Sequence, residues 1–373
     1  YMENSWLKDL KTNLPRFIKS VNKDEFSFNP VSKGLTRDGS KLNLGMSCYG
    51  LKIYYITGLW DELSKDEKLR WGNYLNSFQM SIKPFPDNSF IDQDYLNAYE
   101  KFSISKVIKN IAKKFINLFK PSKYILDKEK LNNYIRAESK QAISTLYQVN
   151  LKNSKLYKFP FNDNEDMFNY LNNLDWTKPW DAGAQFSAMC VFVTTQTESE
   201  KKKKFYTRSL SEFIYSITDK DSGAFFKGEK PNEKELINGA MKVITGLDWI
   251  NAEIPYSEKL IDTCLSIEPY EEGCDLVDLV YVLYMCSKKT NYKEKEIAEY
   301  LKKILLKIKQ HYFYGKGGFS YFINKSQTSY YGVKISEGKK TPDIHGTILL
   351  VWAISMISQI VDLPTSNWKV LKP

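Results

Sequence analysis

The sequence predicts an all-α protein, an α/α toroid of about six inner and six outer helices in a single domain over residues 1–373. Strand patterns are sparse, and most of the chain shows the 3.6-residue apolar period of helices. Two kinds of helical segment alternate along the chain, and about 60 residues per helix pair suits a chain of this length. A solenoid of helix pairs that does not close is the alternative architecture.

The first kind of segment is apolar nearly all round, as expected of a helix that is buried on several sides. Six segments have this character, at roughly 43–59, 135–149, 181–195, 236–250, 274–287 and 343–359. Three of them follow a glycine-containing turn and a polar loop. Gly45, Gly239 and Gly346 stand in the first turns of their segments, where a missing side chain allows close approach of another backbone.

The second kind of segment is amphipathic and rich in lysine. Its members are 4–20, 64–79, 164–174, 199–217, 256–267 and 291–312. Each would lay its apolar stripe on the inner helices and turn its charged face to water. Together the two kinds of segment indicate an inner ring that is enclosed by an outer ring.

Polar residues gather at the starts of the six apolar segments. A helix buried on both sides tolerates such side chains only if they are paired or face a cavity. Because the inner helices of a toroid run in the same direction, these residues would form a polar site at one end of the ring. They are Asn43, Ser47, Arg136, Glu138, Lys140, Gln141, Asp181, Gln185, Asn238, Lys242, Asp275, Asp278, Asp343 and His345.

An anionic ligand suits this site. Arg136, Lys140 and Lys242, together with the positive ends of the helix dipoles, would attract a phosphate, a diphosphate or a uronic carboxylate. Asp181 and Asp343 have an alternative role as helix caps. Arg136 could instead form an internal salt bridge with Glu138.

His345, one of only two histidines in the chain, is open to three interpretations. It could act as an acid or base, or contact the substrate, with a pKa tuned by Asp343 or Asp275. It could bind a metal ion with Asp275 or Asp278 and Cys274. It could also be a buried neutral histidine that is bonded to a backbone carbonyl. The other histidine, His311, ends a basic segment and is expected either at the surface or at the C-terminal end of its helix.

The stretch GGFS…KTPDIHGTILLVWAIS, which ends at residue 355, resembles the C-terminal repeat of the protein prenyltransferase β-subunits and of the wider terpenoid-cyclase toroid superfamily. In that family a GGF-type turn precedes an Asp-x-x-His-Thr helix whose histidine binds zinc. The resemblance implies the toroid fold over most of the chain, with His345, Asp275 and Cys274 as the zinc ligands. The order GCDLVD here differs from the family's Asp-x-Cys, and the Asp-x-Asp-Asp motif of the triterpene cyclases is absent.

The preferred function is therefore prenyltransferase- or terpenoid-cyclase-like chemistry on a phosphorylated isoprenoid or lipid-linked substrate, with zinc or magnesium as the candidate cofactors. A glycan-active hydrolase, lyase or epimerase is the alternative, in which two of Asp181, Asp275, Asp278 and Asp343 act as acid and base. Trp180 and Tyr331 could stack on sugars or line an isoprenoid pocket. A non-catalytic toroid scaffold is the third hypothesis.

The formal charge of +10 favours an acidic partner, although a composition rich in lysine and asparagine also produces it. Nucleic acid is disfavoured because the basic residues are dispersed and no binding motif accompanies them. The five cysteines lack CxxC spacing, which indicates free thiols. The first residues are amphipathic and charged, unlike a signal peptide, so we expect a cytoplasmic protein.

Residues 103–123 form a separate feature, an insertion or outer helix without acidic residues, in which apolar and lysine positions alternate at helical spacing. Such a helix could lie on an anionic membrane surface or in the groove of a partner. It could equally be an outer helix that turns its lysines to water.

Overall fold

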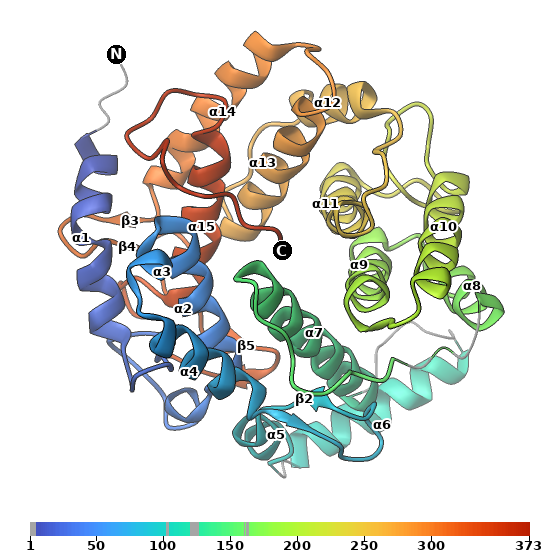
Figure 1. Cartoon of the computed structure of the whole chain (residues 1–373), viewed down its shortest axis with the longest axis horizontal. Helices are drawn as coiled ribbons and strands as arrows, with labels where there is room; N and C mark the ends of the chain where they lie inside the picture. The colour runs from blue at the N-terminus through green and yellow to red at the C-terminus, as the bar shows by residue number, and fades with distance from the viewer. Residues whose placement is uncertain (1–4, 102–103, 120–126, 160, 162–163) are drawn as a thin grey trace.

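The computed structural model describes residues 5–101, 104–119, 127–159, 161 and 164–373. Fifteen α-helices, one short 3-10 helix (Gly39–Lys41) and three two-stranded antiparallel hairpins form the regular structure of these residues (Figure 1). The prediction of a mostly helical chain is confirmed.

Six helices, which we call the core helices, occupy the six apolar segments. They are α2 (Leu44–Thr57), α7 (Asp127–Gln148), α9 (Pro179–Gln196), α11 (Glu233–Trp249), α13 (Gly273–Ser287) and α15 (Ile344–Ile357). Each contacts two others, in the closed order α2, α7, α9, α11, α13, α15 and back to α2 (Figure 1). Their side chains supply much of a single hydrophobic cluster.

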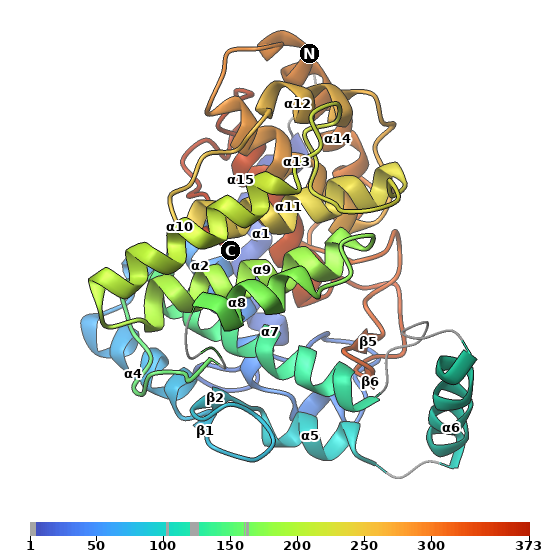
Figure 2. The same ribbon diagram turned by 90° about the vertical axis from the view of Figure 1, so that its right-hand side faces the viewer.

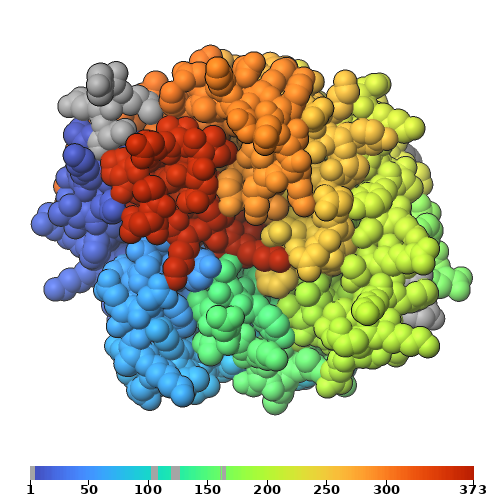
Figure 3. Space-filling model, turned by 45° about the horizontal axis from the view of Figure 1, so that its top comes forward, coloured from blue at the N-terminus to red at the C-terminus, as the bar shows by residue number. Residues whose placement is uncertain are grey.

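Hydrogen bonds at the helix ends show that core helices run in the same direction. At one end, the backbone N–H of Lys369 donates to the Ile56 carbonyl of α2 (2.8 Å), and that of Lys372 donates to the Gln148 side chain of α7 (2.6 Å). The Trp249 indole at the end of α11 donates to the carbonyl of Pro373 (2.6 Å). The C-terminal segment therefore lies across the C-terminal ends of three core helices, and Figure 3 shows it in red against the green of α7.

The N-terminal ends of the core helices meet at the opposite end. Asn238 near the start of α11 donates to Asp275 near the start of α13 (2.9 Å). A Cβ on Gly346 would lie 2.4 Å from the backbone nitrogen of Tyr321, and one on Gly45 would lie 2.0 Å from the Tyr330 hydroxyl. These close approaches confirm why both helices carry glycine in the first turn.

The remaining helices lie around the core helices. They are α1 (Ser5–Val21), α3 (Leu59–Glu62), α4 (Lys65–Asn76), α5 (Gln93–Tyr99), α6 (Ile104–Phe119), α8 (Asn164–Asn172), α10 (Glu200–Ser216), α12 (Ser257–Leu265) and α14 (Glu294–Lys309). The helices α4, α10, α12 and α14 contact core helices directly. The starts of α4, α5 and α10 carry side-chain caps, such as the reciprocal Ser64–Glu67 capping box of α4.

The hairpins are β1 (Gln79–Met80) with β2 (Ser89–Phe90), β3 (Tyr312–Phe313) with β4 (Gly318–Phe319), and β5 (Ser329–Tyr330) with β6 (Val333–Lys334). The last hairpin lies beside the N-terminal end of the core helices, on the same side of the molecule as α6 (Figure 2).

Three details differ from or bear on the sequence predictions. The second core helix begins at Asp127 rather than near 135, because its first two turns are polar and lack the apolar pattern. His311 follows the C-terminal end of α14, one of its two expected places, but it is buried and not at the surface. Its ring nitrogens lie 2.8 and 2.7 Å from the carbonyl oxygens of Ser320 and Glu271. All five cysteines are free thiols, as predicted.

None of the helices in the described ranges is long and apolar enough to cross a bilayer.

Candidate functional site

A cavity of about 670 Å³ lies among the core helices. One face of α7 lines it from Asp127 to Gln141, a length of roughly 21 Å at 1.5 Å per residue. Lys52 of α2, Lys242 of α11, the first turns of α9 and the tip of the β5–β6 hairpin complete most of the wall. Lys109 and Lys113 of α6 also line it, and Pro373 lies among the lining residues.

The charge of this lining is strongly positive. Seven basic side chains line the cavity, against two acidic ones: Lys52, Lys109, Lys113, Lys130, Arg136, Lys140 and Lys242 against Asp127 and Asp181. One of the acidic groups, Asp127, already forms an ion pair with Lys113 (3.4 Å). The net excess of positive charge would attract an anionic group into the cavity.

Three lysines form the centre of this lining, and we call Lys52, Lys140 and Lys242 the lysine triad. They come from three different core helices, and none has an ion pair within 4 Å among the described residues. Burial, with the charges of Lys52 and Lys242, lowers the pKa of Lys140 well below its ordinary value. Burial also lowers the pKa of Lys52, and Lys242 adds to that effect. The triad is thus held at an electrostatic cost that a bound anion would relieve.

Two buried carboxyl groups lie close to the triad. Burial raises the pKa of Glu138 to about 7 and that of Asp278 to about 7, while the charges of Lys52 and Lys242, respectively, oppose these shifts. Glu138 accepts a hydrogen bond from the Tyr330 hydroxyl (2.5 Å). Its second oxygen, like Oδ2 of Asp278, is buried and has no hydrogen-bond partner among the residues that the structure describes. Both groups can therefore change protonation near neutral pH and alter the charge around the triad.

His345 lies beside this cluster and is partly exposed. Its ring stacks on Tyr49, with the centroids 4.8 Å apart, and its Nδ1 lies 3.0 Å from Oε1 of Gln327. Burial, with the charges of Lys52 and Lys242, lowers the pKa of His345 to about 3. This lowered pKa favours the neutral ring. Stacking on Tyr49 and the contact with the Gln327 side-chain amide fix the orientation of the His345 ring.

Asp343 and Asp275 are occupied by local contacts. The carboxylate of Asp343 accepts hydrogen bonds from the backbone N–H groups of Gly346, Tyr321 and Gln327, at 2.7, 2.7 and 3.1 Å. Asp343 is therefore the helix cap that its position suggested. Asp275 forms an ion pair with Lys234 (2.6 Å) and accepts from Asn238.

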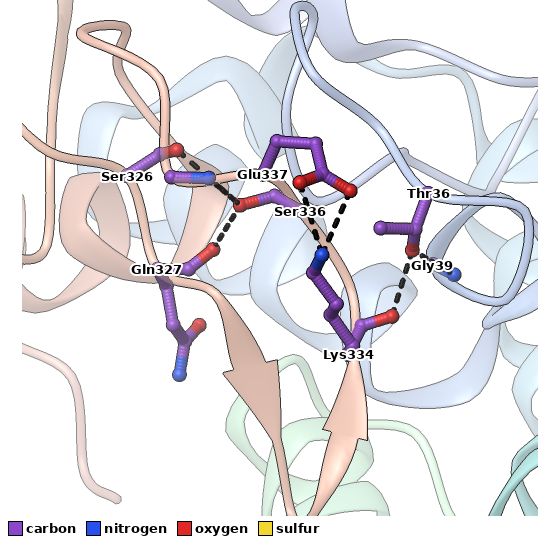
Figure 4. Close-up of polar contacts among 8 residues, drawn as sticks. Thr36, Gly39, Ser326, Gln327, Lys334, Ser336 and Glu337 are labelled. Atoms are coloured by element: carbon purple, nitrogen blue, oxygen red, sulfur yellow. Dashed lines mark hydrogen bonds and ion pairs between the residues drawn. The ribbon is translucent and has the colours of Figure 1, made fainter.

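The β5–β6 hairpin places Tyr330 beside Glu138 and Tyr331 in the cavity wall. Tyr331 and Gly332 form its turn with φ of 43° and 86°, and an aromatic residue in this left-handed region is uncommon. Tyr95 donates a hydrogen bond to the Tyr331 carbonyl (2.7 Å). Figure 4 shows how polar contacts fix the base of the hairpin: Ser336 donates to the Gln327 carbonyl, and Thr36 donates to that of Lys334. Tyr331 is thereby held at the cavity.

The structure brings together about half of the residues that the sequence indicated. Those that line the cavity are Arg136, Lys140, Gln141, Asp181, Gln185, Lys242, Trp180 and Tyr331. Asn43, Ser47, Glu138, Asn238, Asp275, Asp278, Asp343, Cys274 and His345 are not among the lining residues. Lys52 was missed, although it is the only charged residue in the apolar segment of α2. That isolation is the signal that could have identified it.

The predicted zinc ligands do not assemble. Among the described residues no three His, Cys, Asp or Glu side chains come together as a metal-binding group. Asp275 is engaged by Lys234 and Asn238, and burial raises the pKa of the Cys274 thiol to about 12, which disfavours the thiolate that binds zinc. The donors present do not fit a zinc site.

Comparisons with protein-family models, with curated proteins and with solved structures give no match for this chain.

Proposed function

We propose that the chain is an α/α toroid whose central cavity is the substrate site. The closed order of contacts among six helices that run in the same direction supports the inner ring. The contacts of α4, α10, α12 and α14 with these helices support an outer ring. In such an architecture ligands enter at one end of the ring, and here the C-terminal segment lies across the other end.

We propose further that this site takes a substrate with a phosphate or diphosphate group, carried on an isoprenoid or other lipid. The observation that carries the proposal is the lysine triad, three lysines from three core helices that face one cavity and form no ion pair within 4 Å among the described residues. Lys52 is only 9% exposed, whereas Trp180 and Tyr331 are 43% and 50% exposed. The anionic group would therefore bind at depth, with the attached chain among the aromatic side chains nearer the surface.

The ammonium groups would also assist reaction. A carbon–oxygen bond to diphosphate breaks more readily when fixed positive charges stabilise the departing anion. This is the prenyltransferase- or cyclase-like chemistry expected from the sequence, and the triad would supply charge stabilisation through side chains alone. The glycan hypothesis has less support, because Asp343 and Asp275 are held by local contacts and Asp278 is not part of the lining.

The test is a titration of the full chain with inorganic diphosphate, in which isothermal calorimetry measures the binding affinity. Lys140→Gln and Lys242→Gln should each weaken binding about tenfold, or about 1.4 kcal/mol. Lys303→Gln on the solvent side of α14 serves as the matched control and should leave affinity unchanged. Failure of the wild-type chain to bind diphosphate, or equal loss in the control, would contradict the proposal.

A second titration addresses the rest of the substrate. Farnesyl diphosphate should bind more tightly than inorganic diphosphate if the aromatic side chains receive an apolar chain. Tighter binding of an acidic oligosaccharide than of either diphosphate would instead support the glycan hypothesis. Binding of farnesyl diphosphate without any turnover would favour the non-catalytic scaffold.

A further inference from the structure

Four large apolar side chains of helix α6 face solvent. Ile108, Ile111, Phe115 and Leu118, spaced three and four residues apart, are 61%, 62%, 62% and 77% exposed. We call these four residues the apolar stripe. In Figure 2, α6 lies at the side of the molecule, apart from the other helices. A surface helix of a water-soluble domain normally has the opposite orientation.

The polar side of α6 faces the protein. Lys113 forms an ion pair with Asp127 (3.4 Å), and the Asn110 amide donates to the same carboxylate (2.5 Å). Lys109 and Lys113 line the central cavity. The outward position of the apolar stripe is therefore the result of polar contacts on the other side of the helix, at the opening of the cavity.

The charged residues of α6 are all lysines. Between Lys101 and Leu126 the sequence contains no acidic residue. Lys114 is exposed and lies beside the apolar stripe, three residues after Ile111 and four before Leu118. A lysine in this position can extend past a buried apolar stripe to reach lipid phosphates.

We propose that α6 binds the surface of an anionic lipid bilayer, with the apolar stripe at the boundary between headgroups and acyl chains. The helix then lies along the membrane, and the opening of the cavity faces the headgroups. A second copy of the chain fits less well, because two copies of α6 would bring lysines of like charge together. This inference concerns the surface of α6 alone and does not depend on the ligand of the cavity.

The test is co-sedimentation of the full chain with vesicles of phosphatidylcholine, alone or with about 30% phosphatidylserine. The wild-type chain should bind the phosphatidylserine vesicles and lose binding as salt is raised. The variant Ile111→Glu/Leu118→Glu should reduce binding at least about tenfold, because it places two carboxylates in the apolar stripe. Lys114→Gln should reduce binding to anionic vesicles about fivefold.

The matched control is Leu69→Glu/Leu306→Glu, on α4 and α14. These leucines are 47% and 53% exposed, and the change in net charge is the same. The control should bind anionic vesicles as the wild-type chain does. Equal loss in both double variants would show that only net charge matters, and would overturn the proposal.

Two other outcomes would also overturn it. One is a wild-type chain that binds neither kind of vesicle. The other is an α6 variant that keeps vesicle binding but loses a dimer seen by size-exclusion chromatography, which would assign the stripe to a second copy. Diphosphate titration separates this proposal from the proposed function: Lys140→Gln should keep vesicle binding, and the α6 double variant should keep diphosphate binding.

Discussion

Helices α6 and α14 have the same length and a similar pattern of apolar and lysine residues, yet they face opposite ways. On α14 the apolar side chains Ile297, Leu301 and Leu305 are buried against its neighbours, and Lys303 is exposed. On α6 the apolar stripe is exposed, and Lys113 points toward the cavity. The amphipathic pattern therefore determines that a helix has two faces, while its neighbours determine which face is buried.

The neighbours of the two helices explain the difference. α14 contacts α12, α13 and α15, whose side chains are largely apolar. α6 lies instead beside the polar opening of the cavity, where Asp127 binds Lys113 and Asn110. Four substitutions test this comparison, from the largest expected effect to the smallest.

The largest effect is expected on the buried side of α14. Leu305→Asp places an unpaired charge at a fully buried position and should lower the free energy of unfolding by about 4 kcal/mol. Urea denaturation measures the loss. Leu306→Asp, at the exposed neighbouring position, is the control and should cost less than about 0.5 kcal/mol. Similar losses at both positions would mean that the apolar face of α14 is not buried.

The second effect concerns pH. Since the pKa of Glu138 is raised to about 7 from an ordinary 4.5, the folded chain binds this proton more tightly than the unfolded chain does. The contribution of Glu138 to stability should therefore increase as the pH falls from about 8 toward 5, by on the order of 1–3 kcal/mol. Glu138→Gln should remove this contribution. The measurement is the free energy of unfolding against pH, with exposed Glu299→Gln on α14 as a control that leaves the slope unchanged.

The third effect separates cavity lysines from solvent lysines. Lys140→Met removes a desolvated charge that lies close to two others, so the free chain should become more stable by about 1 kcal/mol. Lys303→Met on α14 should change the free energy of unfolding by less than about 0.5 kcal/mol. Thermal denaturation without added anions measures both. A destabilised Lys140→Met variant would indicate that this lysine has a partner that stabilises its charge.

The smallest effect is expected on α6. Ile111→Asp should change the free energy of unfolding by less than about 0.5 kcal/mol, because the side chain is already in water. A loss close to that of Leu305→Asp would show that the apolar stripe is covered in solution. Urea denaturation at several protein concentrations would then reveal whether a second copy provides the cover.

Much of the helical arrangement could be predicted from residues alone. The apolar periodicity placed all six core helices, because a helix buried on several sides must be apolar on several sides. The same rule identified Lys140 and Lys242, since a lysine within an apolar segment must face something polar. The start of α7 was missed because residues 127–133 contain a single apolar side chain, Leu131, which is too few to show an apolar period.

The sequence by itself determined that this chain is helical, which helices are buried, and that cationic side chains interrupt them. Only the tertiary structure decided which of those side chains meet. It joined Lys52 to Lys140 and Lys242, assigned Asp343 to backbone amides, buried His311 between two loops and turned the apolar side of α6 outward. Local periodicity records how much of a helix is buried, whereas the identity of the neighbour depends on contacts between segments far apart in the chain.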